Sequence, residues 1–316
     1  MMMPVKKMRK VLSLPDSLFH WLTMASALMI IVLMISFFAQ LLWYSLPSIR
    51  EFGWGFVLSQ EWDPVRNLYG AAGAIYGTLV TTLIAMLIAA PLSFGIALFL
   101  VEFAPPYLSR VLGQAIDLLA AVPSIIYGMW GLFVFVPIMQ KHVQPFLADT
   151  LGLKALPFFS GPQMGFGLLT SGIILALMIL PFISAVMRDV FRMVPPVVKE
   201  SAYGTGATTW EVTADVTTRY GMQGLLGALF LGLGRAIGET MAVLFIIGHV
   251  QQVSFSLFAP GTTISATLAN NFAEAEGISK SVLFELGLIL LVISFLIQIA
   301  AQYWLNKVRR STGGGL

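Results

Sequence analysis

Apolar residues run through this chain in long blocks rather than in the short alternating patterns of soluble proteins. A helix needs about 20 apolar residues to cross a bilayer. Six stretches meet that length, at roughly 18–46, 70–101, 112–139, 165–187, 225–249 and 282–305. The pattern predicts an all-α integral membrane protein with six transmembrane helices.

Composition supports this class and excludes several kinds of site. Of the 316 residues, 58% are hydrophobic and only 10% are charged, whereas soluble domains have about 25% charged residues. The chain has no cysteine, which excludes disulfides, thiolate metal sites and cysteine nucleophiles. Its histidines, His20, His142 and His249, are far apart and form no H-x-x-x-H pair. We therefore expect no bound metal, no cofactor and no catalytic residue of these kinds.

The charged residues between the apolar stretches predict the orientation. An even number of crossings places both termini on one side. The loops on that side hold most of the lysines and arginines, namely Lys6, Lys7, Arg9, Lys10, Arg110, Arg188, Arg192, Lys199, Arg219, Lys307, Arg309 and Arg310. The other side holds Arg50, Arg66, Lys141, Lys154 and Lys280. Since positively charged loops stay in the cytoplasm, both termini are predicted to be cytoplasmic.

This topology divides the chain into segments. They are a cytoplasmic N-terminal segment at 1–17, a first transmembrane helix at 18–46 with an outer loop to 69, a core of five transmembrane helices at 70–305 with a cytoplasmic loop at 188–224, and a cytoplasmic tail at 306–316. The first apolar stretch is too long for a cleaved signal peptide and lacks a clear A-x-A site, which favours a retained helix.

Two charged residues, Arg235 and Glu239, lie inside the fifth apolar stretch. A charge at the centre of a membrane helix costs roughly 2.5–3.5 kcal/mol on insertion scales. Positions i and i+4 share a helix face, and small residues (Ala228, Gly232 and Ala242) occupy the same face. The two charges either brace the helix as an ion pair or line a path for an anion. We favour the path, because intramembrane charges usually mark transport routes and the planar fork of arginine suits a tetrahedral oxyanion.

Other polar residues near the apolar stretches are weaker candidates. Thr240, Ser124 and Tyr127 could line the same path, although hydroxyl groups in membrane helices commonly bond backbone carbonyls. Asp117, at the start of the third stretch, and Glu285, near the outer end of the sixth, could pair with the intramembrane arginine or cap a helix. We favour a structural role for both.

The cytoplasmic loop 188–224 contains helix signals on both sides of a glycine turn. The residues VVKESAY before Gly206 predict about two turns of helix. Thr208 followed by Glu211 matches a capping box, which predicts a second short helix through about Thr217. Such a compact unit either docks a cytoplasmic partner or simply connects two helices.

Glu200, Ser201 and Ala202, followed after three residues by Gly206, resemble the E-A-A…G signature of membrane subunits of type I ABC importers. In that family this loop is a coupling helix that fits a cleft in the ATPase subunit. The resemblance therefore implies that these four residues couple the chain to an ATPase.

The family pattern continues to a hydrophobic-x-Leu-Pro ending. This chain has Val216 at the hydrophobic position, but Thr218 and Arg219 stand in place of Leu and Pro.

The resemblance covers nearly the whole chain from about Pro47. The segments EWDP (61–64), IYGTLVTT (75–82), AAPLSFGIALFLVEFAP (89–105), LLAAVPSIIYGMWG (118–131), ILPFISAVMRDVF (179–191) and GLGRAIGETMAV (232–243) are similar to the PstC-type permease family of phosphate ABC transporters. The resemblance implies a multi-pass subunit of the bacterial inner (plasma) membrane that moves inorganic phosphate into the cytoplasm by alternating access. It also implies that Arg235 and Glu239 lie in the transport path.

The implied partners are a second homologous permease subunit (PstA-like), a dimer of cytoplasmic ATPase subunits (PstB-like), a periplasmic phosphate-binding protein (PstS-like) and the lipid bilayer. No nucleic acid is expected to bind. The chain has no G-x-x-x-x-G-K-[ST] motif, so it is not expected to bind nucleotide or to be an enzyme itself.

Three other functions stay open. The chain could be a type I ABC permease for another oxyanion, such as sulfate or molybdate. It could be a proton-coupled anion carrier with Glu239 as the relay, which the lack of a duplicated second half disfavours. A membrane enzyme is the least supported, because the sequence has no G-x-S-x-G and no H-E-x-x-H motif.

Overall fold

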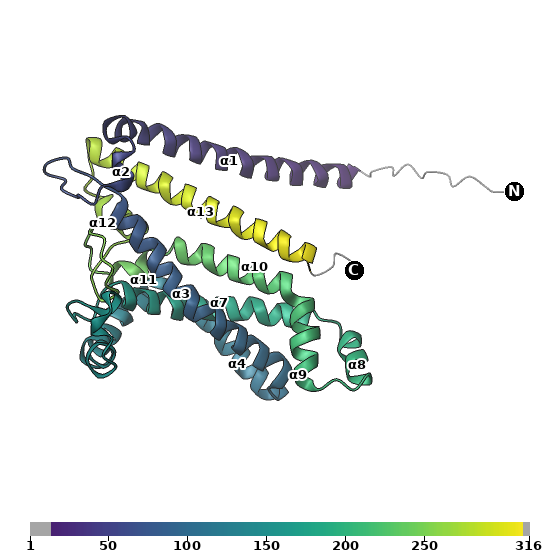
Figure 1. Cartoon of the computed structure of the whole chain (residues 1–316). Coiled ribbons are helices and arrows are strands. Elements are labelled where there is room, and N and C mark those ends of the chain that lie inside the picture. The colour runs from purple at the N-terminus through teal and green to yellow at the C-terminus, as the bar shows by residue number, and fades with distance from the viewer. Residues whose placement is uncertain (1–13, 312–316) are drawn as a thin grey trace.

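The computed structural model describes residues 14–311 and is built from helices (Figure 1). Within that range there is no strand, only two isolated bridges, between Asp63 and Leu68 and between Gly248 and Gly261. The all-α prediction is therefore confirmed. Most of the predicted segment 1–17, with its four basic residues, and the end of the tail 306–316 lie outside the described residues.

Five helical stretches within residues 14–311 are long and apolar enough to cross a membrane. They are Asp16–Phe52 in α1 (Leu14–Phe52), Ala72–Phe103 formed by α3 (Ala72–Leu98) and a π-helical segment (Phe99–Phe103), Ser124–Thr150 beginning with α5 (Ser124–Trp130), Leu168–Arg192 (α7), and Gly277–Lys307 in α13 (Gly277–Ser311). The number of membrane crossings stays a prediction.

Shorter helices connect these stretches. They are α2 (Gly55–Leu58), α4 (Pro106–Ala120), α6 (Val136–Ile138), α8 (Pro196–Gly204), α9 (Thr209–Glu211), α10 (Thr218–Ile237), α11 (Met241–Leu244) and α12 (Ile264–Asn271).

The predicted helix over 112–139 is wrong as a continuous element. α4 ends at Ala120, and α5 begins at Ser124. Pro123 lies between them and has no N–H to continue the hydrogen-bond ladder. The amphipathic α4 and the more apolar α5 are therefore separate helices.

The predicted helix over 225–249 is also interrupted. α10 ends at Ile237, and Gly238 begins a break of three residues before the short α11. Glycine has a low helix propensity. In addition, the Ala242 amide donates a hydrogen bond to the Glu239 side chain, and such side-chain bonds compete with the backbone hydrogen bonds of a helix. Helical periodicity therefore does not extend through this stretch.

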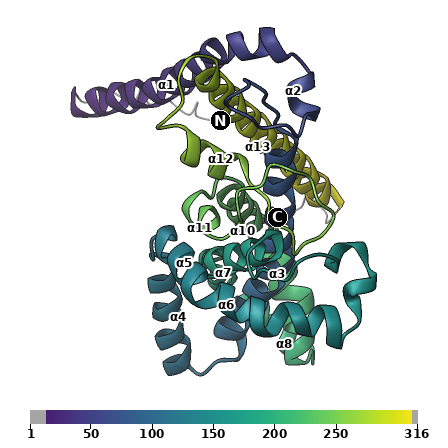
Figure 2. The same ribbon diagram turned by 90° about the vertical axis from the view of Figure 1, so that its left-hand side faces the viewer.

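The most buried long helix is α7, which contacts α3, α4 and α10 (Figure 2). Fully buried apolar side chains line it along its length, among them Ile174, Ile179, Ile183, Met187 and Phe191. In contrast, α1 lies along α13 at one side of the molecule (Figure 1). The most apolar part of α1 is not buried inside the chain at all. Because exposed apolar surface of this length is unfavourable in water, α1 faces lipid or another chain.

The two ends of the molecule carry different elements. The start of α1 and the end of α13 lie at the same end as α8 and α9, whereas α2 and α12 lie at the opposite end (Figure 1). This arrangement agrees with the prediction that both termini and the loop 188–224 lie on the same side of the membrane. Which membrane face that side occupies stays a prediction.

Small residues bring α10 close to α7. A Cβ atom added at Gly232 would lie 2.4 Å from Cδ1 of Ile183. Ala228 and Ala236, on the same helix, are only 1% and 3% exposed. Close helix contact through small residues is typical of membrane helix pairs.

Replacing Gly232 with alanine should therefore lower the thermal stability of the chain. The added methyl group must displace Ile183, and overpacking of this kind costs about 1–3 kcal/mol. Gly227→Ala is the matched control in the same helix, because no atom lies within 4 Å of its added Cβ. Thermal unfolding of the detergent-solubilised chain, followed by circular dichroism, measures both. Equal melting temperatures would contradict the close packing.

Candidate functional site

Three predicted site residues lie at the break between α10 and α11 or in the helical turn before it. Arg235 lies in the last turn of α10, whereas Glu239 and Thr240 lie beyond the end of that helix. The expectation that Arg235 and Glu239 share one helix face is therefore wrong. Within residues 14–311, no carboxylate lies within 4.0 Å of the Arg235 guanidinium. The direct ion pair of the bracing interpretation is not formed.

Arg235 is positioned by an aromatic side chain of the neighbouring helix. Its guanidinium carbon lies 5.3 Å from the centre of the Phe182 ring in α7, a distance at which ring and cation attract each other. Tyr127 of α5 is within electrostatic range of the same charge. Neither neighbour is an acid, and no residue in the described part of the chain forms an ion pair with this half-buried side chain.

Glu239 and Thr240 shape the backbone of the break. A Glu239 carboxylate oxygen accepts a hydrogen bond of 3.3 Å from the Ala242 amide, at the start of α11. The Thr240 hydroxyl donates to the Gly238 carbonyl at 3.3 Å. Both side chains are half-buried, so each has a structural contact and part of its surface free.

A second helix break, between α4 and α5, precedes a helix that packs against α11. The Tyr127 hydroxyl donates to the Leu119 carbonyl at 3.1 Å and so bridges α4 and α5. A Cβ atom on Gly128 would lie 2.7 Å from the Met241 carbonyl oxygen, which shows how closely α5 approaches α11. Ser124, the first residue of α5, is half-buried beside its break. At membrane depth, irregular backbone is tolerated only where it is buried in protein or lines a water-filled cavity.

The two weaker acidic candidates, Asp117 and Glu285, contact residues other than Arg235. Asp117 accepts two hydrogen bonds, of 2.8 and 3.0 Å, from Nη2 of Arg188 in α7. Glu285 is 5% exposed in α13, beside Ser48 of α1. Neither acid pairs with Arg235, which agrees with the structural roles favoured for them.

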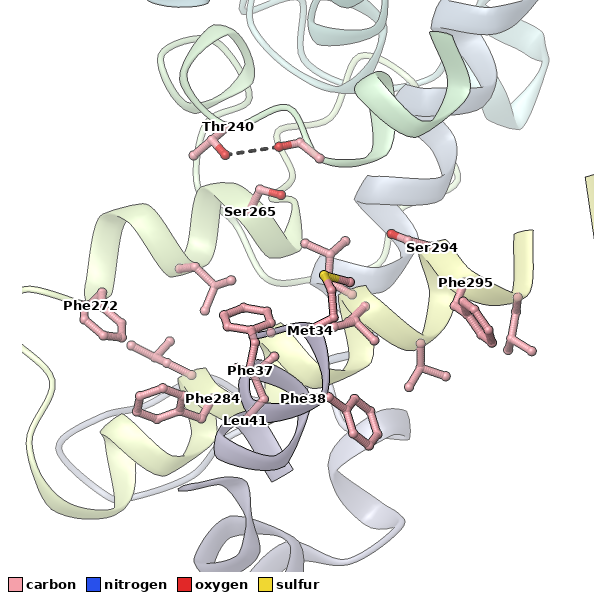
Figure 3. A pocket seen from close by; sticks show the side chains of 18 of the residues that line it. Met34, Phe37, Phe38, Leu41, Thr240, Ser265, Phe272, Phe284, Ser294 and Phe295 are labelled. Atoms are coloured by element: carbon pink, nitrogen blue, oxygen red, sulfur yellow. Dashed lines mark hydrogen bonds between the residues drawn. The ribbon is translucent and has the colours of Figure 1, made fainter. Parts of the chain in front are cut away.

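An open apolar groove of about 1250 Å³ runs from the α10 break along α1 and α13. Figure 3 shows its aromatic wall, with Phe37 from α1, Phe272 directly after α12, and Phe284 from α13. Thr240 lines the same groove. The break is thus reached from an apolar surface that this chain does not cover by itself.

The loop after α7 forms the predicted helix–turn–helix. α8 and α9 flank a turn in which Gly206 has a φ of +90°, a conformation that favours glycine. The capping box is confirmed, because Thr208 and Glu211 exchange both expected hydrogen bonds. The predicted end of the second helix at Thr217 is wrong.

The chain stays helical through a π-helical segment, Val212–Thr217, and continues into α10. Thr218 and Arg219 stand where the family pattern has Leu and Pro. Without a proline at this position, nothing in the backbone stops the helix.

The residues that resemble the coupling signature lie on the surface of this unit. Glu200, Ser201 and Gly206 are exposed and Ala202 is half-buried. Large apolar side chains are exposed beside them, with Val197 at 72% and Trp210 at 69%. Clustered exposed apolar residues of this kind mark interaction surfaces.

An ion pair fixes this unit to the rest of the molecule. Nζ of Lys199, in α8, lies 2.5 Å from a carboxylate oxygen of Glu102, in the π-helical segment after α3. Both side chains are largely buried, so the pair is shielded from solvent screening. Neither residue stood out in the sequence.

Replacing Thr208 with alanine should loosen the start of α9. Ncap substitutions of this kind cost about 1 kcal/mol, so amide exchange at the start of α9 should become several-fold faster. Thr209→Ala, at an exposed neighbouring residue that does not cap the helix, is the matched control. Hydrogen exchange with mass spectrometry measures both. Equal exchange in the two variants would contradict the capping role.

The cap should also depend on pH. Hydrogen bonds from the Thr208 amide and hydroxyl hold the pKa of Glu211 below its ordinary value. A lowered folded-state pKa stabilises the cap above the unfolded value, and the stabilisation is lost as the pH falls through the lowered pKa. We therefore expect the difference between Thr208→Ala and the unmodified chain to be full at pH 7 and to shrink in acid.

Comparison with known proteins adds to this geometry. Residues 92–310 match the family described as binding-protein-dependent transport system inner membrane component. The chain is 52% identical to the phosphate transport system permease protein PstC of Haemophilus influenzae, over 94% of this chain and 95% of that protein. It is 51% identical to the protein of the same name from Mesorhizobium japonicum, over 95% and 93%.

A solved structure has the same fold. A bacterial ABC transporter involved in the import of the acidic polysaccharide alginate superposes with a TM-score of 0.63. The two chains are 16% identical, and the match covers 93% of this chain and 98% of that one. At this identity the likeness concerns the fold alone.

Proposed function

This chain belongs to the PstC family of phosphate transport permeases, within the binding-protein-dependent transport system inner membrane components, and we propose that it carries inorganic phosphate across the inner membrane. It does so as one permease subunit of an ATP-driven importer. The proposal depends on Arg235, a half-buried cation next to a helix break that has no acidic partner among residues 14–311. A transported oxyanion would supply the missing negative charge.

Each residue of the break has a distinct role in this proposal. Arg235 donates hydrogen bonds to phosphate oxygens, since its planar donors match an oxyanion. Glu239 holds the start of α11 through Ala242 and repels the anion, so that phosphate does not stay bound to Arg235. Thr240 offers its hydroxyl beside the same break.

The remaining parts of the transporter come from other proteins. A second, PstA-like permease covers the apolar groove along α1 and α13 and closes the path. A PstS-like binding protein delivers phosphate at the outer end. A dimer of PstB-like ATPase subunits binds the exposed face of α8 and α9, hydrolyses ATP and drives alternating access. The exposed residues Val197 and Trp210 suit such a contact.

Uptake measurements test the proposal. Cells that lack their own phosphate importer would express this chain with its partners, and the uptake of labelled phosphate and sulfate would be compared. We expect phosphate uptake that depends on ATP. Uptake of sulfate alone would assign the chain to another oxyanion. Phosphate transport by the purified chain alone, driven by a proton gradient, would support the carrier alternative instead.

A further inference from the structure

A cationic cleft lies between α4 and α7, separate from the α10 break. It has a volume of about 440 Å³. Its lining consists of Pro106, Ser109, Arg110, Gly113, Gln114 and Asp117 from α4, with Arg188 and Arg192 from α7. Because α7 leads directly into α8, the cleft lies near the coupling unit.

Positive charge dominates this cleft. Among the described residues that line it, three are arginines and one, Asp117, is an acid. Asp117 is bound to Nη2 of Arg188. Asp189 lies outside the lining, 3.9 Å from Nε of Arg188 and 4.0 Å from Nη1 of Arg192, so these contacts are longer than hydrogen bonds.

Arg188 is the central residue of the cleft. It is only 5% exposed, and its Nε has no hydrogen-bond partner within residues 14–311. A Cβ atom on Gly113 would lie 2.7 Å from its Nη1, so a glycine is needed for the guanidinium to reach α4. A buried donor without a partner is unfavourable, and an anionic acceptor in the cleft would satisfy it.

The start of α4 adds to the attraction for an anion. This helix of 15 residues begins at Pro106, and no side chain caps its start. The N-terminal end of a helix carries partial positive charge and binds anions. Ser109 and Arg110 lie in its first turns. The helix dipole and these side chains therefore both favour an anion in the cleft.

We propose that this cleft binds a phosphate group, either as free inorganic phosphate or as the headgroup of an anionic phospholipid. Arginine forks bind phosphate oxygens through paired, charge-assisted hydrogen bonds. Val111 and Leu118, which flank the lining face of α4, are exposed, and their apolar side chains suit the acyl chains of a lipid. The inference does not rest on phosphate transport, because a lipid headgroup binds whether or not the chain transports phosphate.

The test compares three forms of the purified full chain, namely the unmodified chain, a cleft variant and a control variant. The cleft variant is Arg110→Gln with Arg192→Gln, which leaves the buried Arg188 in place. The control is Arg66→Gln with Arg219→Gln, which removes the same charge from two exposed arginines outside the cleft. Equal melting temperatures by circular dichroism would establish that both variants are folded.

Two arms distinguish the sources of the phosphate group. Equilibrium dialysis, with Arg235→Gln added to all three forms so that the proposed transport site does not contribute, measures binding of labelled inorganic phosphate. Native mass spectrometry measures retention of phosphatidylglycerol against phosphatidylcholine. We expect the cleft variant to bind about tenfold more weakly than both other forms in at least one arm. A loss in the first arm identifies free phosphate, and a loss in the second identifies the headgroup. Equal binding by all three forms in both arms would overturn the proposal.

Discussion

Replacing Arg235 with glutamine should reduce phosphate uptake by about 10- to 100-fold, because a hydrogen bond to a charged group contributes about 1.5–3 kcal/mol. Glutamine keeps some donor capacity and much of the length but removes the charge. The guanidinium makes no ion pair within residues 14–311, so its loss leaves no buried carboxylate without a partner. We therefore expect a large effect on transport and a small effect on the amount of folded protein in the membrane.

Labelled phosphate uptake at matched membrane abundance measures this effect. Arg219→Gln is the control on the same helix, since Arg219 is exposed and its ion pair with Asp215 is exposed as well. Combining Arg235→Gln with Glu239→Gln separates two roles. If Glu239 only holds α11, the double variant is no better than Arg235→Gln alone, whereas partial recovery would show that Glu239 repels the anion. Normal uptake by Arg235→Gln would place the transport path elsewhere.

Replacing Gly206 with valine should separate ATP hydrolysis from transport. The φ of +90° at this turn is strained for any residue with a Cβ atom, whatever the free space around it. Strain of this kind costs about 1–3 kcal/mol, and the turn relieves it by changing the angle between α8 and α9. We expect phosphate transported per ATP to fall by about tenfold, because the docking face loses its shape.

Gly204→Ala is the matched control for this change. Gly204 ends α8 with no atom within 4 Å of an added Cβ and without a positive φ. Proteoliposomes that contain the complete transporter allow ATPase activity and phosphate transport to be measured together. Coupling that is equal in the two variants would contradict the role of the turn.

Local signals in the sequence are sufficient to predict the helix–turn–helix formed by α8 and α9. The turn at Gly206 and the capping box of Thr208 and Glu211 depend on residues close together in the chain, so they could be predicted and are confirmed. The long apolar stretches likewise predicted the helical class.

The two interrupted helices were harder to predict. A proline at position 123 and a glycine at 238 are both tolerated inside membrane helices, so neither requires a break. At Glu239 the break also depends on a side chain that bonds the backbone of Ala242. The prediction of a shared face for Arg235 and Glu239 failed for this reason.

Contacts between distant segments had no signal in the sequence. Arg188 and Asp117 are 71 positions apart, and Lys199 and Glu102 are 97 apart. A single sequence does not show which charged residues meet across the fold. The cleft between α4 and α7 could therefore be recognised only after the helices were placed.

The ion pair between Lys199 and Glu102 has a mechanical consequence. The helical stretch Ala72–Phe103 has 32 residues, which at about 1.5 Å per residue makes a lever about 48 Å long. Its far end contacts α12, where the Thr78 hydroxyl accepts a hydrogen bond from the Ile264 amide. A tilt of about 5° imposed at the Glu102 end would swing the opposite end by about 4 Å. A push on α8 that tilted this helix would therefore reach α12, at the opposite end of the molecule (Figure 1).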